Sequence, residues 1–331
     1  MLVKTPNGAQ DIRAVWMENE VVRAIDQRAL PHRFEIVEID NSESLAEAIS
    51  DMTIRGAPSI GAAAAYGLAL AAIRCEDMDE AADRMRATRP TAHDLFYAVN
   101  LMLSERERLP GAADEYSDSI VARCKSIGEH GLDLIRDGSK ILTHCNAGAL
   151  ATVDFGTALA PMRLARRAGK EFFVYVDETR PRLQGAKLTA WELLNEGIDH
   201  AIISDNASGH YIRDDVDVVI VGADRIAGNG DFANKIGTYE KAVLARENGV
   251  PFYVAAPIST FDPSLLNGDE IVIEQRSPNE VLILDGVRVA PEGSDALNPA
   301  FDMTPSRYVS GFITEAGLLK PDELSKLLDT Q

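Results

Sequence analysis

The chain has 331 residues, of which 46% are hydrophobic and 26% are charged, and its formal net charge at pH 7 is −19. This composition excludes a disordered chain, and the length predicts one large domain or two domains with a substantial core. Nucleic acids and anionic membranes attract basic surfaces, so the acidic excess argues against both as partners.

The cysteines and the apolar segments indicate a cytoplasmic protein. Cys75, Cys124 and Cys145 form no CxxC motif, and this small odd number argues against a disulfide framework. The first residues have no signal-peptide pattern, and the most apolar stretch, Ser59 to Ile73, is shorter than the roughly 20 residues that cross a bilayer. The histidines show no metal-ligand spacing, so we expect no metal.

After an extended opening, the first third of the chain is predicted to be mainly helical. Phe34–Asp40 alternates apolar and polar residues, which predicts a half-buried strand. Ser44 and Glu47 predict a capping box for the next helix, which we expect to end near Arg55. Pro58 suits the first turn of an Ala-rich helix because its missing N–H costs nothing there. Two further helices are predicted at Ala92–Leu109 and Tyr116–Arg136.

From Lys140 onward, short apolar runs alternate with segments of helical length. The runs are 141–143, 172–176, 201–203, 218–221 and 252–256. This alternation predicts a doubly wound, mainly parallel sheet. We therefore predict an α/β protein with an N-terminal mainly helical domain that carries a small β element, residues 1–130, and a C-terminal Rossmann-like domain, residues 131–331.

Polar and reactive residues follow four of these predicted strands. They are the segments 143–148, 177–181, 204–206 and 222–225. Ligands of open parallel sheets bind beyond the carboxyl ends of the strands. The four segments are therefore expected to lie on one rim and to form the ligand site.

Cys145 is a candidate nucleophile or base on this rim. A lone cysteine is often a small buried apolar residue, but Cys145 follows a strand and precedes Asn146, Gly148 and a predicted helix start. A helix N-terminus would stabilise its thiolate. The adjacent His144 is expected to point to the opposite face, so a Cys–His dyad is not predicted.

Asp224 and two candidate anion-binding patterns suggest acid/base chemistry on an anion. Asp224 follows a buried strand, although an aspartate there can also cap a loop. Lys235 and free N–H groups at the start of the next helix are predicted to hold a phosphate. Arg55, Gly56 and Ala57 form a second candidate anion site, with a plain turn between helices as the alternative. No Walker or GxGxxG motif is present, so neither ATP nor NAD is indicated.

Several segments together resemble one family. They are 26–31, 55–61, 142–152, 178–193, 222–238 and 298–305. In this order, over nearly the whole chain, they are similar to the methylthioribose-1-phosphate isomerases of methionine salvage. The resemblance implies a cofactor-free homodimer that converts an aldose 1-phosphate into a ketose 1-phosphate.

The resemblance also implies roles for individual residues. Asp224 would be the general acid/base and Cys145 its catalytic partner. Substrate binding would involve Arg55, Gly56, Ala57, Arg89, Gln184, Asn234 and Lys235. Arg89 depends on a shorter match at 88–92.

A mechanism can be drafted from these residues. Asp224, protonated in a dry pocket, would donate a proton to the ring oxygen, and the Cys145 thiolate would remove the proton from C2. A hydride shift from C2 to C1 is the alternative route.

Other functions stay open at this point. Ribose-1,5-bisphosphate isomerases keep the Cys and Asp pair, and Arg180 and Arg182 are candidates for their second phosphate site. Activity on 5-deoxyribose 1-phosphate is a third option, because a pocket for methylthio accepts a methyl group at modest cost. Regulatory subunits of the translation-initiation exchange factor belong to the same superfamily but typically lack the catalytic pair.

Overall fold

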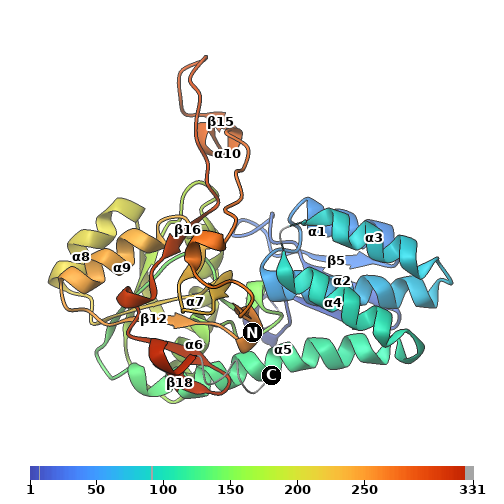
Figure 1. Ribbon diagram of the computed structural model, residues 1–331, viewed down its shortest axis with the longest axis horizontal. Coiled ribbons are helices and arrows are strands. Elements are labelled where there is room, and N and C mark those ends of the chain that lie inside the picture. The colour runs from blue at the N-terminus through green and yellow to red at the C-terminus, as the bar shows by residue number, and fades with distance from the viewer. Residues whose placement is uncertain (7, 91, 325–331) are drawn as a thin grey trace. The chain divides into compact units, whose positions relative to one another are not determined.

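The computed structural model describes residues 1–6, 8–90 and 92–324, and the chain divides into two compact units (Figure 1). Unit 1 comprises Met1–Ser126 and Ala147–Ala160, and unit 2 comprises Ile127–Asn146 and the chain from Pro161 onward. The second segment of unit 1 therefore interrupts the sequence of unit 2 directly after Asn146.

Unit 1 contains two small antiparallel β elements. A hairpin pairs β1 (Leu2–Thr5) with β2 (Gly8–Asp11). A three-stranded sheet has the order β3 (Val15–Glu18), β4 (Val21–Ile25), β5 (Ile36–Ile39). β5 confirms the strand predicted at Phe34–Asp40, whereas the sequence indicated β3 and β4 only as extended chain.

The remainder of unit 1 is helical, as predicted. Its helices are α1 (Ser42–Ser50), α2 (Ala57–Ile73), α3 (Met78–Thr88), α4 (His93–Ser104) and α5 (Gly111–Gly131), which continues into unit 2. Thirteen residues of α2 are buried, because its run of small side chains lets neighbouring helices approach closely. Pro58 lies in the first turn of α2, as predicted.

The predicted cap of α1 is wrong. The N-cap is Asn41, whose side chain accepts a 2.8 Å hydrogen bond from the amide of Ser44, so Ser44 already lies in the first turn. The helix also ends at Ser50, five residues before the predicted end, because Asp51 turns the chain by accepting bonds from the amide and hydroxyl of Thr53.

Unit 2 is built on a seven-stranded sheet of order β18-β17-β12-β9-β6-β7-β8. Its strands are β6 (Lys140–Thr143), β7 (Phe173–Asp177), β8 (Asp199–Ile203), β9 (Val218–Val221), β12 (Phe252–Ala255), β17 (Gly311–Thr314) and β18 (Gly317–Leu319). All neighbours are parallel except the edge pair β17–β18. The five apolar runs are therefore strands, and the α/β doubly wound fold is confirmed.

Helices and a second sheet complete unit 2. The helices are α6 (Leu159–Arg167), the π-helical turn η4 (Gly185–Thr189), α7 (Ala190–Glu196), α8 (Ser208–Asp214), α9 (Thr238–Glu247) and α10 (Asn279–Leu282). The second sheet has the order β13 (Phe261–Asp262), β10 (Arg225–Ala227), β11 (Phe232–Lys235), β16 (Phe301–Thr304). α10 and the hairpin of β14 (Ile283–Leu284) with β15 (Val287–Arg288) form an arm at the top of Figure 1.

Short 3-10 turns connect many of these elements. They are η1 (Arg106–Arg108), η2 (Leu132–Leu134), η3 (Ala149–Ala151), η5 (Asp205–Ala207), η6 (Ile258–Thr260), η7 (Gly268–Glu270), η8 (Ser306–Tyr308) and η9 (Pro321–Glu323). Across the described residues, every helix is too short or too polar to span a bilayer.

Candidate active site

The order of the strands places two predicted catalytic residues at the centre of the sheet. From β6 the chain proceeds to β7 and β8 on one side, and then returns to β9 on the other side of β6. β6 and β9 are parallel neighbours, with Ile141 opposite Val218. Ligands of doubly wound sheets bind at this reversal, beyond the carboxyl ends of the strands. Cys145 follows β6 and Asp224 follows β9, so both leave the sheet at the reversal.

Cys145 has an unusual backbone conformation. It is half-buried, and its φ of 66° lies in the left-handed region that residues other than glycine seldom adopt. Its amide donates to the Thr179 hydroxyl over 2.9 Å, and its carbonyl accepts from the Thr189 hydroxyl over 2.6 Å. The side chains of two threonines therefore bind both backbone groups of Cys145.

The helix start predicted after Cys145 is wrong. The next helical element, η3, is a single 3-10 turn, and α6 begins only at Leu159. Val153 and Phe155 have φ angles of 67° and 63°, and they turn the chain between the two elements. The α-helix start that was expected to stabilise a thiolate at Cys145 is therefore not present at this position.

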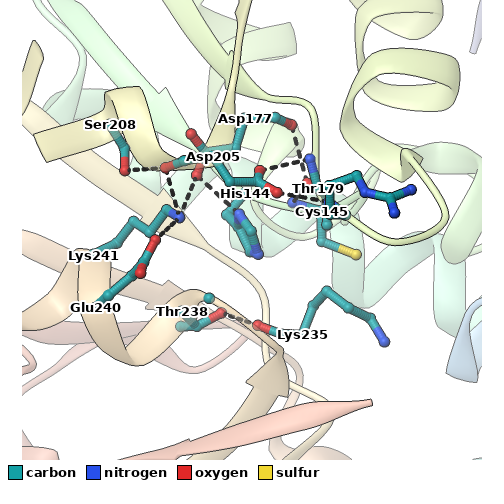
Figure 2. A network of polar contacts seen from close by, with 12 residues as sticks. His144, Cys145, Asp177, Thr179, Asp205, Ser208, Lys235, Thr238, Glu240 and Lys241 are labelled. Carbon is teal, nitrogen blue, oxygen red and sulfur yellow. Dashed lines mark hydrogen bonds and ion pairs between the residues drawn. The ribbon is translucent and has the colours of Figure 1, made fainter. Parts of the chain in front are cut away.

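A buried polar network lies under the site (Figure 2). His144 Nδ1 lies 2.9 Å from an Asp177 carboxylate oxygen, and His144 Nε2 lies 2.8 Å from the carbonyl oxygen of Ile236. The ammonium of Lys241 lies 3.3 Å from the same oxygen of Asp177. Both nitrogens of His144 are thus bonded away from Cys145, as expected from the alternation along the strand.

The charges in this network compensate one another. Burial lowers the pKa of Lys241, but Asp177, Glu240 and Asp205 outweigh it, so the pKa is raised above its ordinary value. The potential ligand atoms of His144, Asp177 and Asp205 lie within 4.8 Å of one another, a spacing that could hold a metal ion. Lys241 already contributes a positive charge there, since it is bonded to Asp177 and to the carbonyl of Asp205.

The loop after β7 is fixed by Asp205. Its two carboxylate oxygens accept bonds of 2.7 Å from the amides of Thr179 and Arg180. Gly185 then passes so close to β7 that a Cβ atom would lie 1.7 Å from the carbonyl oxygen of Asp177. Gln184 directly precedes Gly185. Its side chain is 9% exposed, and its Oε1 has no hydrogen-bond partner in the part of the chain that the structure describes. Gln184 is therefore an available acceptor for a ligand.

Lys235 interacts electrostatically with both predicted catalytic residues. Its side chain is 8% exposed, and burial lowers its pKa below the ordinary 10.5. The charges of Cys145 and Asp224 offset part of this effect, so Lys235 lies within electrostatic reach of both. In Figure 2 the side chains of Cys145 and Lys235 extend away from the buried network on the same side.

Two of the amides that were expected to be free at the start of α9 are already bonded within the chain. The amides of Gly237 and Tyr239 donate to the two carboxylate oxygens of Asp302. Asp302 reaches them because β16 pairs with β11, with Asn234 opposite Asp302. Asn234 is 5% exposed and donates to the Thr238 hydroxyl. Lys235 is left as the candidate cation of this segment.

The environment of Asp224 also differs from the prediction. Its amide bonds to the carbonyl of Ala233 over 2.9 Å, which fixes its backbone at the start of the β10–β11 hairpin. The residue is exposed rather than enclosed in a dry pocket. The reason is that Asp224 lies past the end of β9, at the rim rather than inside the sheet.

The other predicted binding residues belong to unit 1. Arg55 Nε donates to Gln27 Oε1 over 3.0 Å, and Gln27 donates to the carbonyl of Leu150. Gly56 has a φ of 93°, and a Cβ atom there would lie 2.4 Å from the Cα of Ala151, so glycine is required. Ala57 is the first residue of α2. Arg89 is half-buried at the C-cap of α3.

Sequence reasoning missed several residues that shape the site. Thr179, Thr189, Asp177 and Lys241 all lie at 0% exposure. The motif that contains the threonines was recognised, but a hydroxyl that binds a backbone 34 or 44 residues away has no local signature. Only the position of Asp177 at a strand end was a usable signal.

Comparison with known proteins identifies the family. The model of the Initiation factor 2 subunit family matches residues 53–321. The methylthioribose-1-phosphate isomerase of Geobacter metallireducens is 50% identical, over 94% of this chain and 96% of that protein. The chain belongs to the methylthioribose-1-phosphate isomerase family. It is accordingly an isomerase of the aldose–ketose class.

Solved structures agree with membership of the methylthioribose-1-phosphate isomerase family. The 5-methylthioribose 1-phosphate isomerase of Pyrococcus horikoshii superposes with a TM-score of 0.91 at 42% identity and covers 97% of both chains. A protein described as translation initiation factor eIF-2B subunit delta from A. fulgidus gives a TM-score of 0.88 at 40% identity, over 96% of this chain and 100% of that one. Both enzyme and initiation-factor descriptions therefore occur among close structural relatives.

Proposed function

We propose that this isomerase converts 5-methylthioribose 1-phosphate into 5-methylthioribulose 1-phosphate in methionine salvage, with Asp224 and Cys145 as its acid/base pair. The observation that carries the proposal is the placement of these two residues after the adjacent strands β6 and β9, where the sheet order reverses. Lys235, which interacts with the charges of both, is the phosphate-binding cation on unit 2. We further propose a cytoplasmic homodimer that needs no cofactor.

The substrate explains the need for an acid. A phosphate ester on the anomeric carbon prevents ordinary ring opening to an aldehyde. In the proposed route, Asp224 donates a proton to the ring oxygen, and the bond between that oxygen and C1 breaks. The resulting oxocarbenium-like centre at C1 acidifies the C2 proton. Asp224 must be protonated for this step, so substrate has to remove the solvent that surrounds it in the free chain.

The second half of the reaction moves the proton between carbons. The Cys145 thiolate removes the C2 proton and leaves an enol phosphate. The C2 hydroxyl then transfers its proton to the Asp224 carboxylate, and C1 takes a proton from the Cys145 thiol. Both groups return to their starting states, and the product is the 2-ketose 1-phosphate. A hydride shift from C2 to C1 is the alternative, in which Cys145 positions the substrate without exchanging a proton.

The binding roles follow the same reasoning. Lys235 attracts the phosphate, and the unpartnered Oε1 of Gln184 accepts a bond from a sugar hydroxyl. Asn234 positions Lys235 through its bond to Thr238. On unit 1, Arg55 with the Gly56–Ala57 turn, and Arg89, are proposed as further phosphate or sugar contacts.

Two observations weigh on the alternative functions. Arg180 donates to the carbonyl oxygens of Pro181 and Val281, and Arg182 pairs with Glu280, so the chain itself occupies the two arginines considered for a second phosphate. This supports a substrate without a 5-phosphate. The resemblance to the A. fulgidus protein favours a regulatory role as the second candidate, and the presence of both Cys145 and Asp224 argues against it.

The deciding experiment is a phosphorus and proton NMR time course on the purified chain. Methylthioribose 1-phosphate, 5-deoxyribose 1-phosphate and ribose 1,5-bisphosphate are supplied in separate tubes. Conversion of the first at the highest kcat/KM is the expected result. Preference for the bisphosphate would change the assigned substrate but leave the proposed isomerisation chemistry intact. Lack of reaction with all three compounds would support the regulatory function. In D2O, deuterium at C1 of the product shows exchange at the Cys145 thiol during the transfer, and it contradicts the hydride shift.

A further inference from the structure

The backbone of Cys145 is held from both sides by buried hydroxyl groups. The Thr179 hydroxyl accepts from the Cys145 amide over 2.9 Å and donates to the Asp177 carbonyl over 3.0 Å. The Thr189 hydroxyl donates to the Cys145 carbonyl over 2.6 Å and accepts from the Asn146 side chain over 3.1 Å. A hydroxyl has one proton to donate, and each threonine uses it for one partner while accepting from another.

Each threonine is itself anchored to a charged group, the half-buried Asp205 for Thr179 and the buried Glu192 for Thr189. The amide of Thr179 is bonded to the Asp205 carboxylate, which also holds the next amide of the loop. Asn146, the partner of Thr189, donates to Glu192 over 2.9 Å, and Glu192 pairs with Arg163 at 2.8 Å. Glu192 and Arg163 are 1% exposed. The hydroxyls are thus attached to a rigid frame on both sides of Cys145.

The conformation of Cys145 needs such a frame. A left-handed backbone is unfavourable for a residue with a Cβ, and it persists where surrounding contacts impose it. Thr179 has the same left-handed conformation, with φ 66°. The two strained residues are joined by the hydrogen bond between them. Rotation of Cys145 out of this conformation would redirect its thiol.

We propose that Thr179 and Thr189 are positioning residues, which hold Cys145 in its left-handed conformation and so aim its thiol at the substrate. This inference rests on the proposed role of Cys145 as a catalytic base. Neither threonine needs to contact substrate, because both act through the Cys145 backbone. Serine retains the hydroxyl and fulfils the role, whereas valine has the shape of threonine without the hydroxyl.

The test compares Thr179→Val and Thr189→Val with Thr179→Ser and Thr189→Ser. All variants carry Cys75→Ser, which removes the exposed thiol. Thr304→Val is the matched control, because Thr304 is 0% exposed and its hydroxyl has no hydrogen-bond partner among the described residues. Three quantities are measured: kcat and KM, the melting temperature, and the pH dependence of Cys145 alkylation by iodoacetamide.

The valine variants are expected to lose about 10- to 100-fold in kcat, the effect of a misplaced reactive group, with KM little changed. The pH dependence of their Cys145 alkylation should differ from that of the parent. The serine variants should restore both the parental kcat and the parental pH dependence. Thr304→Val should match the parent. Valine variants with parental kcat and alkylation would overturn the inference, and so would serine variants as impaired as valine. If Cys145→Ser keeps the parental rate, the catalytic role of Cys145 fails instead.

Discussion

The ammonium of Lys235 lies 4.3 Å from the centre of the Phe301 ring and donates a 2.7 Å hydrogen bond to the carbonyl of Ala300. A ring face and a carbonyl are weaker partners for a cation than a carboxylate or bulk water. Burial accordingly lowers the pKa of Lys235 below its ordinary 10.5. Lys235 is therefore held at a cost to folding, in a place where an arriving phosphate would compensate its charge.

Lys235→Met should stabilise the fold and weaken binding. Between the lowered pKa and 10.5 the unfolded chain binds more protons than the folded chain, so stability rises with pH in that window. Below the window the cost of Lys235 is fully present. We expect the methionine variant to unfold at higher denaturant concentration near neutral pH, with an advantage that shrinks toward pH 10.5. Phosphate-ester affinity should fall about 10- to 100-fold, because a charged hydrogen bond contributes roughly 1.5–3 kcal/mol.

Lys4→Met is the control for this change, since Lys4 lies on the exposed side of β1. Its stability should differ little from the parent at any pH, and its KM should not change. A Lys235→Met variant that is less stable than the parent near pH 7 would show that the site favours the charged ammonium. Unchanged affinity would remove Lys235 from phosphate binding.

Asp224→Asn and Cys145→Ser should separate chemistry from binding. The asparagine cannot donate the proton to the ring oxygen, and the serine hydroxyl is a far weaker base than a thiolate. We expect kcat to fall by at least about 100-fold in each, within the range for general acid/base groups, while substrate affinity by calorimetry stays within a few-fold. The control is Asp214→Asn, because Asp214 lies at an exposed site of α8. Asp231→Asn is not suitable as a control, because the Asp231 carboxylate accepts hydrogen bonds from backbone amides. Substantial turnover by either catalytic variant would contradict its assigned role.

Asp177→Asn should weaken the fold more than a surface change does. Asp177 is the shared anion of His144 and Lys241, and all three side chains are at most 1% exposed. Removing one partner of a buried pair costs about 3–5 kcal/mol because the remaining charge is left uncompensated. The pKa of Lys241 is raised, so its stabilising contribution is present below 10.5 and is lost only above it. The part of the deficit that is due to Lys241 should therefore be present at neutral pH and decline only above pH 10.5.

Asp118→Asn provides the comparison on the surface. Asp118 is 63% exposed and pairs with Arg13, and such pairs contribute about 0–1 kcal/mol. Chemical denaturation at several pH values measures both variants. An Asp177→Asn chain as stable as the Asp118→Asn chain would show that the buried network contributes no net stability.

Much of the fold was accessible from the sequence because its signals are local. The run 218–221 is strand β9, residue for residue, since a run of this length between polar segments suits a buried strand and is too short for a typical helix. The positions of Cys145 and Asp224 at strand ends followed from the same runs. Their proximity did not, because it depends on β9 returning beside β6, and that pairing joins segments 77 residues apart (Ile141 with Val218).

Two of the failures depend on contacts between residues that are far apart in the sequence. The amides at the start of α9 were expected to be free, but Asp302, 65 residues from Gly237, occupies two of them. Lys241 is buried because it pairs with Asp177, 64 residues earlier. From the sequence alone, a lysine on a helix is predicted to lie on the surface. The cap of α1 was a local error: Asn41 and Ser44 are both good caps, and Asn41, with φ −143° and ψ 159°, is the residue with extended backbone.

Gly185→Ala should disable the site through the backbone. An added Cβ would lie 1.7 Å from the Asp177 carbonyl oxygen and 3.0 Å from the Thr179 hydroxyl, so the π-helical turn η4 has to move away from β7. The movement would displace Gln184 and break the contact frame of Thr179, which holds Cys145. We expect a loss of stability of about 1–3 kcal/mol, as for overpacked cores, and a much larger loss of kcat/KM than the stability loss explains. Gly111→Ala, at the first position of α5 with no atom near the new Cβ, should be neutral or slightly stabilising. Thermal unfolding and steady-state kinetics on both variants decide the matter: a Gly185→Ala enzyme with parental kcat/KM would mean that the close approach of η4 to β7 is not needed to place Gln184 and Cys145.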